Sequence, residues 1–210
     1  MELQSPSPES ANIKHKSSQN VLPPYLDFNC VFITDNDNVY RWASNETFIF
    51  RIFKMLHQFA VFRVILDGIT DINPVWQAVL RVDDIVEKKL QIYVKNTLVL
   101  YCVSTDSYEK IVPFIIGKYS RLILHGNITI YQLSPLATQY VDKIRVSARM
   151  EIPQEKYDNF ALFMVRQTHG NYPCFTISRN ETFTPEFDKK ITRTFPFILY
   201  YPYKLLYQRS

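Results

Sequence analysis

The chain has 210 residues, of which 47% are hydrophobic and 21% are charged, and its formal net charge is +4. It is therefore long and apolar enough to form one large folded domain, and this composition excludes a wholly disordered chain. Only four glycines are present, which excludes most glycine-loop phosphate chemistry. The three cysteines are widely spaced and form no CxxC pair, which argues against a disulfide framework or a zinc knuckle and favours a reducing, intracellular compartment.

The N-terminal part predicts an arm followed by a small extension. Residues 1–24 are polar and rich in serine and proline, and predict a disordered arm without a secretory signal. The apolar runs 28–34 and 39–42 lie on either side of the turn-forming residues 35–38, a pattern typical of a β-hairpin. Apolar residues at helical spacing in 47–58 predict a short amphipathic helix.

From Ala60 onward the apolar residues recur with a period of two, which predicts a β-rich domain. The first strand is predicted over 60–72 and is interrupted by Gly68, as at a bulge or a barrel corner. Two further strands are predicted over 77–83 and 90–104. In the second of these the odd-numbered face carries tyrosines, and the apolar residues are at the even positions Leu90, Ile92, Val94, Leu98, Leu100 and Cys102.

A short helix and a fourth strand follow. Residues 105–116 predict the helix, with Asp106 as its N-cap and Glu109 three residues later, as in a capping box. Residues 121–132 show the clearest alternation in the chain and predict the fourth strand. Its leucines and isoleucines face one way, while its histidine, asparagine, threonine and tyrosine face the other.

The remaining segments leave two alternatives for a fifth strand, 141–152 or 160–167. The linker 134–139 precedes the first of them. Beyond the second, residues 174–178 predict another strand and 185–191 predict a helix. An aromatic tail ends the chain, and its longest apolar run is too short and too broken by prolines to span a bilayer.

This order of elements predicts an all-β fold with short helices. A long glycine-bent strand, two strands, a short helix and two more strands is the order of the five-stranded OB-fold barrel. We predict that this barrel occupies 59–191. The N-terminal arm 1–24, an extension of hairpin and helix over 25–58, and the C-terminal tail 192–210 complete the chain.

Three stretches resemble the first OB domain of the protection-of-telomeres and telomere end-binding proteins. They are Ser107–Pro113, Ile128–Tyr131 and the segment that runs from Asn159–Leu162 to Phe183–Phe187. That family binds the single-stranded G-rich end of chromosomes in a groove across the barrel. The resemblance implies a nuclear protein at telomeres that binds single-stranded telomeric DNA, protects chromosome ends and regulates telomere length alongside other telomere-associated proteins. It also implies that Tyr131 stacks on a base and that His125 lies beside the groove.

Stacking on bases requires exposed aromatic faces together with cations. Outward positions of the predicted strands supply both. The predicted nucleic-acid-binding residues are Arg81, Tyr93, Lys95, Tyr101, His125, Thr129, Tyr131 and Arg166. The competing interpretation is that an outward tyrosine is simply a good strand former and that His125 is an ordinary surface histidine.

The sequence argues against an enzyme. Asp83 and Asp84, with Asp67 and Asp71 nearby, could be magnesium ligands, but adjacent aspartates on a strand point to opposite faces, which favours a turn. No metal or other cofactor, no membrane and no small-molecule substrate is expected. The alternative function is an OB-fold interaction subunit of a telomere or other DNA-maintenance complex that does not bind DNA itself, which the low net charge favours.

Overall fold

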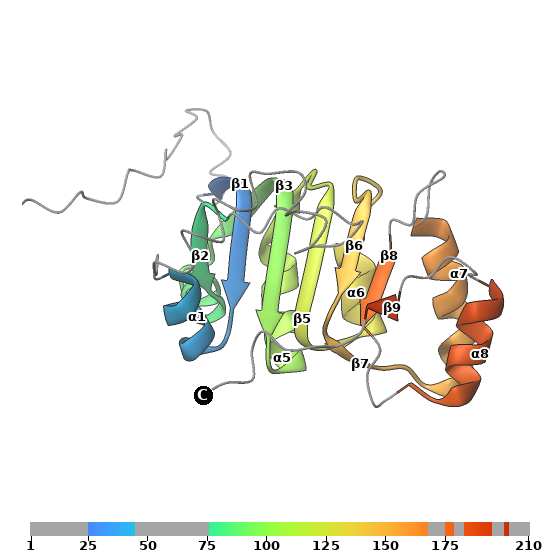
Figure 1. The fold of residues 1–210 in the computed structure, drawn as a ribbon. Helices are drawn as coiled ribbons and strands as arrows, with labels where there is room; N and C mark the ends of the chain where they lie inside the picture. Colours follow the sequence, from blue (N-terminus) through green and yellow to red (C-terminus); the bar gives the residue numbers. More distant parts are fainter. Residues whose placement is uncertain (1–24, 45–75, 168–174, 179–182, 195–199, 202–210) are drawn as a thin grey trace, which may run out of the picture.

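The computed structural model describes residues 25–44, 76–167, 175–178, 183–194 and 200–201. These residues form a β-sheet flanked by helices, which is an α/β arrangement (Figure 1). Every described pair of neighbouring strands runs parallel. The prediction of an all-β, five-stranded OB barrel is therefore wrong, because that barrel is an antiparallel architecture.

The order of the strands places the N-terminal strand inside the sheet. Across the sheet lie β2 (Ala78–Arg81), β1 (Tyr25–Thr34), β3 (Gln91–Cys102), β5 (Arg121–Thr129), β6 (Lys143–Val146), β8 (Phe175–Ser178) and β9 (Tyr200–Tyr201). Two short strands lie off this path: β4 (Ile115–Gly117) pairs with β3, and β7 (Arg149–Glu151) pairs with β5. Because β1 lies between β2 and β3, the predicted extension contributes a strand of the sheet itself.

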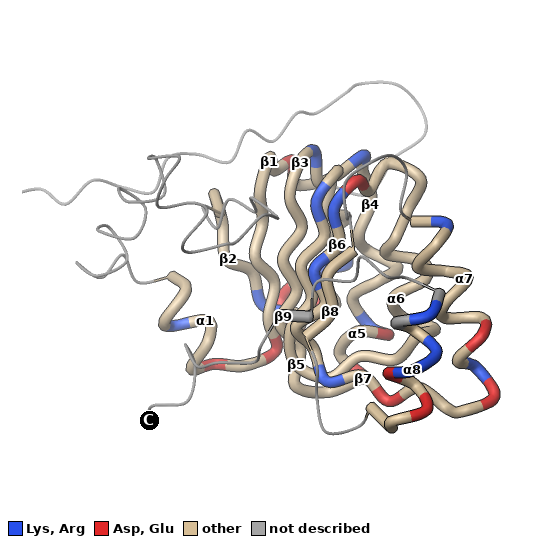
Figure 2. Tube along the Cα trace, turned by 45° about the vertical axis from the view of Figure 1, so that its right-hand side comes forward, with Lys and Arg blue, Asp and Glu red and all other residues tan. Residues whose placement is uncertain are grey.

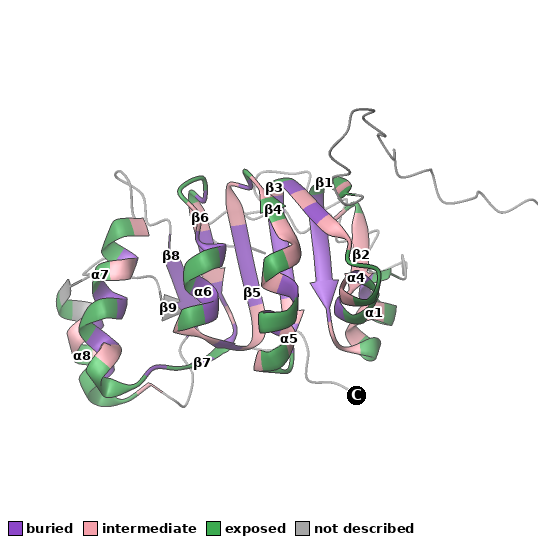
Figure 3. Cartoon of the chain, turned by 180° about the vertical axis from the view of Figure 1, so that it is seen from behind, coloured by how far each residue is buried: buried purple, intermediate pink, exposed green. Residues whose placement is uncertain are grey.

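The helices lie mainly on one side. They are α1 (Asp37–Ser44), α4 (Val82–Glu87), α5 (Thr105–Ile111), α6 (Ile130–Leu136), α7 (Tyr157–Gln167) and α8 (Pro185–Thr194), with short 3-10 turns at Val112–Phe114 and Gln154–Lys156. Helix α1 lies on the side facing the viewer in Figure 1, called here the front face, and α4, α5 and α6 cover the back face (Figure 3). No helix among the described residues is long and apolar enough to cross a membrane.

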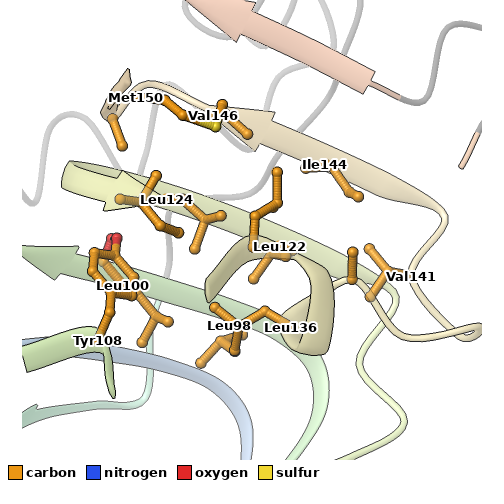
Figure 4. Close-up of a cluster of buried hydrophobic side chains, with 14 of the residues drawn as sticks. Leu98, Leu100, Tyr108, Leu122, Leu124, Leu136, Val141, Ile144, Val146 and Met150 are labelled. Carbon is orange, nitrogen blue, oxygen red and sulfur yellow. The ribbon is translucent and has the colours of Figure 1, made fainter. Parts of the chain in front are cut away.

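The main core lies between the back face and its helices. Leu98, Leu122, Ile144 and Phe175 are register partners on four successive strands, and each is at most 2% exposed. Figure 4 shows the leucines and isoleucine of this row on the side where Tyr108 also lies. Full burial of one such aliphatic side chain stabilises the fold by about 1.5–3 kcal/mol.

A smaller apolar cluster covers part of the front face. Phe32, Val99 and Ile123 are register neighbours on β1, β3 and β5, and they pack with Ala43 of α1. The ring of Trp76 lies 4.8 Å from that of Phe32, and its Nε1–H donates to the carbonyl of Ala43 at 3.1 Å. Helix α1 is thereby fixed over the strands at one end of the sheet.

Two errors of prediction come from capping residues. Residues 39–42, predicted as the second strand of a hairpin, lie in α1, because the side-chain oxygen of Asn36 accepts the N–H groups of Asn38 and Val39 at 2.9 and 3.0 Å. The predicted strand 121–132 ends at Thr129, which forms a capping box with Gln132 at the start of α6.

The predicted strand 160–167 is also wrong, since these residues belong to α7. Four other predicted strands are confirmed in whole or in part: 77–83 by β2, 90–104 by β3, 141–152 by β6 with β7, and 174–178 by β8. The predicted helices 105–116 and 185–191 are confirmed in the same way by α5 and α8. The predicted arm 1–24, helix 47–58 and strand 60–72 lie outside the described residues, as do residues 195–199 and 202–210 of the predicted tail.

Candidate functional site

The carboxyl ends of the strands are where open α/β sheets usually bind ligands. In this chain the described polar groups at that edge bind one another. Asp35, just after β1, accepts the backbone N–H groups of Val103 and Ser104 at 2.9 and 3.1 Å. Asn127 Nδ2 donates to the carbonyl of Val103 at 2.6 Å, and Gln132 Nε2 donates to the carbonyl of Thr105 at 2.8 Å. These side chains hold the ends of β1, β3 and β5 together.

Replacing Asp35 by alanine should lower the free energy of unfolding by about 1–2 kcal/mol, because two backbone donors lose a charged acceptor while water can still reach them. Asp35→Asn keeps one acceptor oxygen and should cost less. Urea unfolding of both variants measures the difference, and equal stability of Asp35→Ala and the unaltered protein would contradict the role assigned to this carboxylate.

On the front face, two predicted site residues lie side by side. Tyr101 of β3 and His125 of β5 are register partners, and their stacked rings have centroids 6.0 Å apart. Burial, together with the positive charge of Arg145 on β6, lowers the pKa of His125 to about 4. The imidazole is therefore neutral at pH 7 and contributes a flat ring but no charge.

The low pKa of His125 predicts a loss of stability in mild acid. Between about pH 6.5 and pH 4 the unfolded chain binds a proton at this residue that the folded chain does not, so the free energy of unfolding should fall as the pH falls through this window. We expect the His125 contribution to be about 1–3 kcal/mol. Carboxylates titrate in the same range, so the test compares urea unfolding of the unaltered protein and His125→Gln at about pH 7 and pH 4.5. If the difference in free energy of unfolding between the two proteins is the same at both pH values, this prediction is contradicted.

Basic residues continue the same face next to His125. Arg121 of β5 lies directly opposite Lys143 of β6, and Ile123 lies opposite Arg145. The neighbours Leu122 and Ile144 point into the main core, so alternation places the three cations on the front face. Figure 2 shows basic positions along both strands. Arg121, Lys143 and Arg145 are half-buried, and we call them the cation cluster.

Three other predicted residues on the sheet are held by local contacts. Arg81, at the end of β2, pairs with Asp37 and lies over the ring of Tyr40, 5.0 Å from its centroid. Lys95 Nζ lies 2.7 Å from an Asp27 carboxylate oxygen. Tyr93 is the register partner of Asp27 and lies on the same face as Lys95. Tyr93 is eight positions before Tyr101 on one strand, about 26 Å at roughly 3.3 Å per residue, so the two do not form one site.

The last three predicted residues do not join the Tyr101–His125 pair. The hydroxyl of Thr129 accepts the N–H of Gln132 as the cap of α6. Tyr131 is in that helix, 68% exposed, and lines an open groove with Glu151 and Pro153. Its predicted place on a barrel strand is therefore wrong. Arg166 is exposed on α7, next to α8 at the other end of the sheet (Figure 1).

The cation cluster was not among the predicted site residues. The sequence does contain a signal for it: Arg121 has the same parity as His125, and Lys143 and Arg145 alternate with Ile144 and Val146. The missing information was that β5 and β6 are parallel neighbours in a register that places Arg121 opposite Lys143.

The cysteines and the aspartate pair singled out in the sequence differ from the cation cluster in kind and surroundings. The thiols of Cys30 and Cys102 are buried, and burial raises the pKa of Cys30 to about 11 and that of Cys102 further, so both stay protonated at pH 7. Asp83 and Asp84, considered above as magnesium ligands, are exposed in the first turn of α4. Within the part of the chain that the structure describes, no cluster of histidine, cysteine and acidic residues could hold a metal ion.

Comparisons of the chain with protein-family models, with curated proteins and with solved structures find no match.

Proposed function

We propose that this chain is a recognition module that binds a partner protein through the front face of its sheet. The observation that carries the proposal is the repetition from β3 to β8: Leu98, Leu122, Ile144 and Phe175 occupy equivalent register positions, at intervals of roughly 20–30 residues. Between these strands the chain passes through α5, α6 and α7, whose buried residues pack in the main core. Stacked strand–helix units of this kind use the sheet face opposite their connecting helices as an extended binding surface. In this chain that is the front face of β3 to β8, beside the cluster that α1 covers.

A second candidate is single-stranded nucleic acid. The stacked rings of Tyr101 and His125 beside the cation cluster favour it, since aromatic faces with nearby cations bind unpaired bases. Telomeric DNA as the ligand, and the telomere as the location, remain predictions from the sequence resemblance. The barrel groove on which that resemblance depended is not part of the described fold.

The test is affinity purification followed by reconstitution. The tagged full chain, the front-face variant Arg121→Glu and the matched back-side variant Lys110→Glu on α5 are used to capture proteins, and each captured protein is then purified and titrated against all three. A partner bound by the unaltered chain and by Lys110→Glu, but not by Arg121→Glu, is the expected result. Partners that depend on Lys110 and not on Arg121 would contradict the proposal, and anisotropy with labelled oligo-thymidine tests the second candidate.

A further inference from the structure

Arg121 and Lys143 differ from the other cations of the sheet in their surroundings. They are register partners on adjacent parallel strands and point to the same face. Like charges directly opposite one another in a sheet are destabilising. Both side chains are half-buried, which weakens the screening of their repulsion by water.

Two other cations of the sheet, Arg81 and Lys95, each have an acid beside them. Arg81 pairs with Asp37, and Lys95 pairs with Asp27 on the same front face. Among the described residues, neither Arg121 nor Lys143 forms an ion pair of this kind. A carboxylate supplied from outside the described strands would compensate the two charges as Asp27 compensates Lys95.

Within the described part of the sheet, the register partners on the flanking strands add no acid beside this pair. Thr97 of β3 is the register partner of Arg121, and Thr176 of β8 is that of Arg145, so both flanking strands carry buried, uncharged hydroxyl side chains at these positions. The acid nearest in sequence, Asp142, lies in the exposed turn before β6, where its backbone N–H donates to the carbonyl of Ser120 at 2.8 Å.

We propose that Arg121 and Lys143 bind adjacent carboxylates of an acidic peptide segment, with Arg145 extending the positive surface along β6; this deepens, and rests on, the proposed recognition of a partner protein. The guanidinium of Arg121 provides paired N–H donors that match a carboxylate, and Lys143 provides a point charge beside it.

The size of the cluster favours an acidic peptide over a nucleic acid. Its three cations lie within two residues of one another along two strands, so they span about 7 Å along the sheet. Tight binding of a nucleic acid needs a track of many phosphate contacts. The net charge of +4 over the whole chain supplies no large excess for such a track.

The experiment titrates the full chain into a fluorescein-labelled oligo-glutamate peptide and follows anisotropy at low salt. Binding should weaken steeply as salt is added, and oligo-glutamine should not bind. Arg121→Gln and Lys143→Gln should each weaken binding about tenfold, the loss typical of one charge-assisted contact. Lys110→Gln, a neutralisation on the exposed side of α5, should change it less than about twofold, which controls for net charge. Circular dichroism melts of all three variants establish that they are folded.

Each other outcome has a defined meaning. If oligo-glutamate does not bind, or if Lys110→Gln weakens binding as much as Arg121→Gln, the acidic-peptide site is wrong. A reconstituted partner protein that still depends on the front face would then leave the proposed function intact. If labelled oligo-thymidine binds more tightly than oligo-glutamate and shows the same dependence on Arg121 and Lys143, the cluster serves nucleic acid and this inference is overturned.

Discussion

Replacing Tyr108 by alanine is expected to lower the free energy of unfolding by about 3–5 kcal/mol, the cost of a large aromatic cavity. Tyr108 is fully buried in α5, and its hydroxyl donates to the carbonyl of His125 on β5 at 2.7 Å. The side chain therefore joins a helix to the centre of the sheet. Urea unfolding, followed by circular dichroism, measures the loss.

Two comparisons separate the parts of this effect. Tyr108→Phe keeps the ring and removes the hydrogen bond, so it should cost only about 1–2 kcal/mol. Tyr131→Ala removes the same side chain from an exposed position of α6 and should stay within about 0.5 kcal/mol of the unaltered protein. If Tyr131→Ala lowered the free energy of unfolding strongly and Tyr108→Ala lowered it little, the packing of α5 and α6 described above would be contradicted.

Replacing Phe160 by alanine is expected to cost about 3–5 kcal/mol, while Leu162→Ala should cost less than about 0.5 kcal/mol. Phe160 is fully buried against Phe175 and Phe187, whereas Leu162 is 53% exposed. In a strand these two positions share a face, but in helix α7 they do not. The pair of variants thus distinguishes the helix from the strand that the sequence pattern predicts.

Thermal and urea unfolding of the two variants, with Met164→Ala as a third, make this test. Met164 is buried one turn after Phe160, so Met164→Ala should lower the free energy of unfolding by about 2–5 kcal/mol. Equal costs at Phe160 and Leu162 would contradict the helix.

The strands of the sheet were largely predictable because their apolar period is strong. In β3 the even-numbered apolar residues Ile92, Val94, Leu98, Leu100 and Cys102 face the core, as predicted. The same period arises in parallel and antiparallel sheets, however, so it does not reveal the direction of neighbouring strands. The predicted OB barrel requires antiparallel neighbours, and the prediction was wrong because the neighbouring strands are parallel.

The helices were the weaker part of the prediction because several are short and follow a strand without a break. Helix α6 has seven residues, and its first two, Ile130 and Tyr131, continue the alternation of β5. Only the capping box of Thr129 and Gln132 marks the change. In α7 the buried set Phe160, Ala161 and Met164 has helical spacing, but its many apolar residues also suit a strand.

The candidate site was predictable only in part. Tyr101 and His125 were selected for their outward parity, and they meet because β3 and β5 are neighbours. The opposition of Arg121 and Lys143 depends on the register of β5 with β6 across a helical connection, which local sequence does not specify.

The parallel sheet is the central claim, and interstrand nuclear Overhauser effects test it most directly. Antiparallel pairing brings opposing Cα atoms to about 4.5 Å at alternate positions, with strong Hα–Hα contacts, and parallel pairing does not. For β1 and β3 the register places Phe32 opposite Val99, and for β3 and β5 it places Leu98 opposite Leu122. We expect amide-to-Hα contacts around both pairs without strong Hα–Hα contacts. Strong Hα–Hα contacts between these strands, or contacts that run in opposite sequence directions, would contradict the fold and the site built on it.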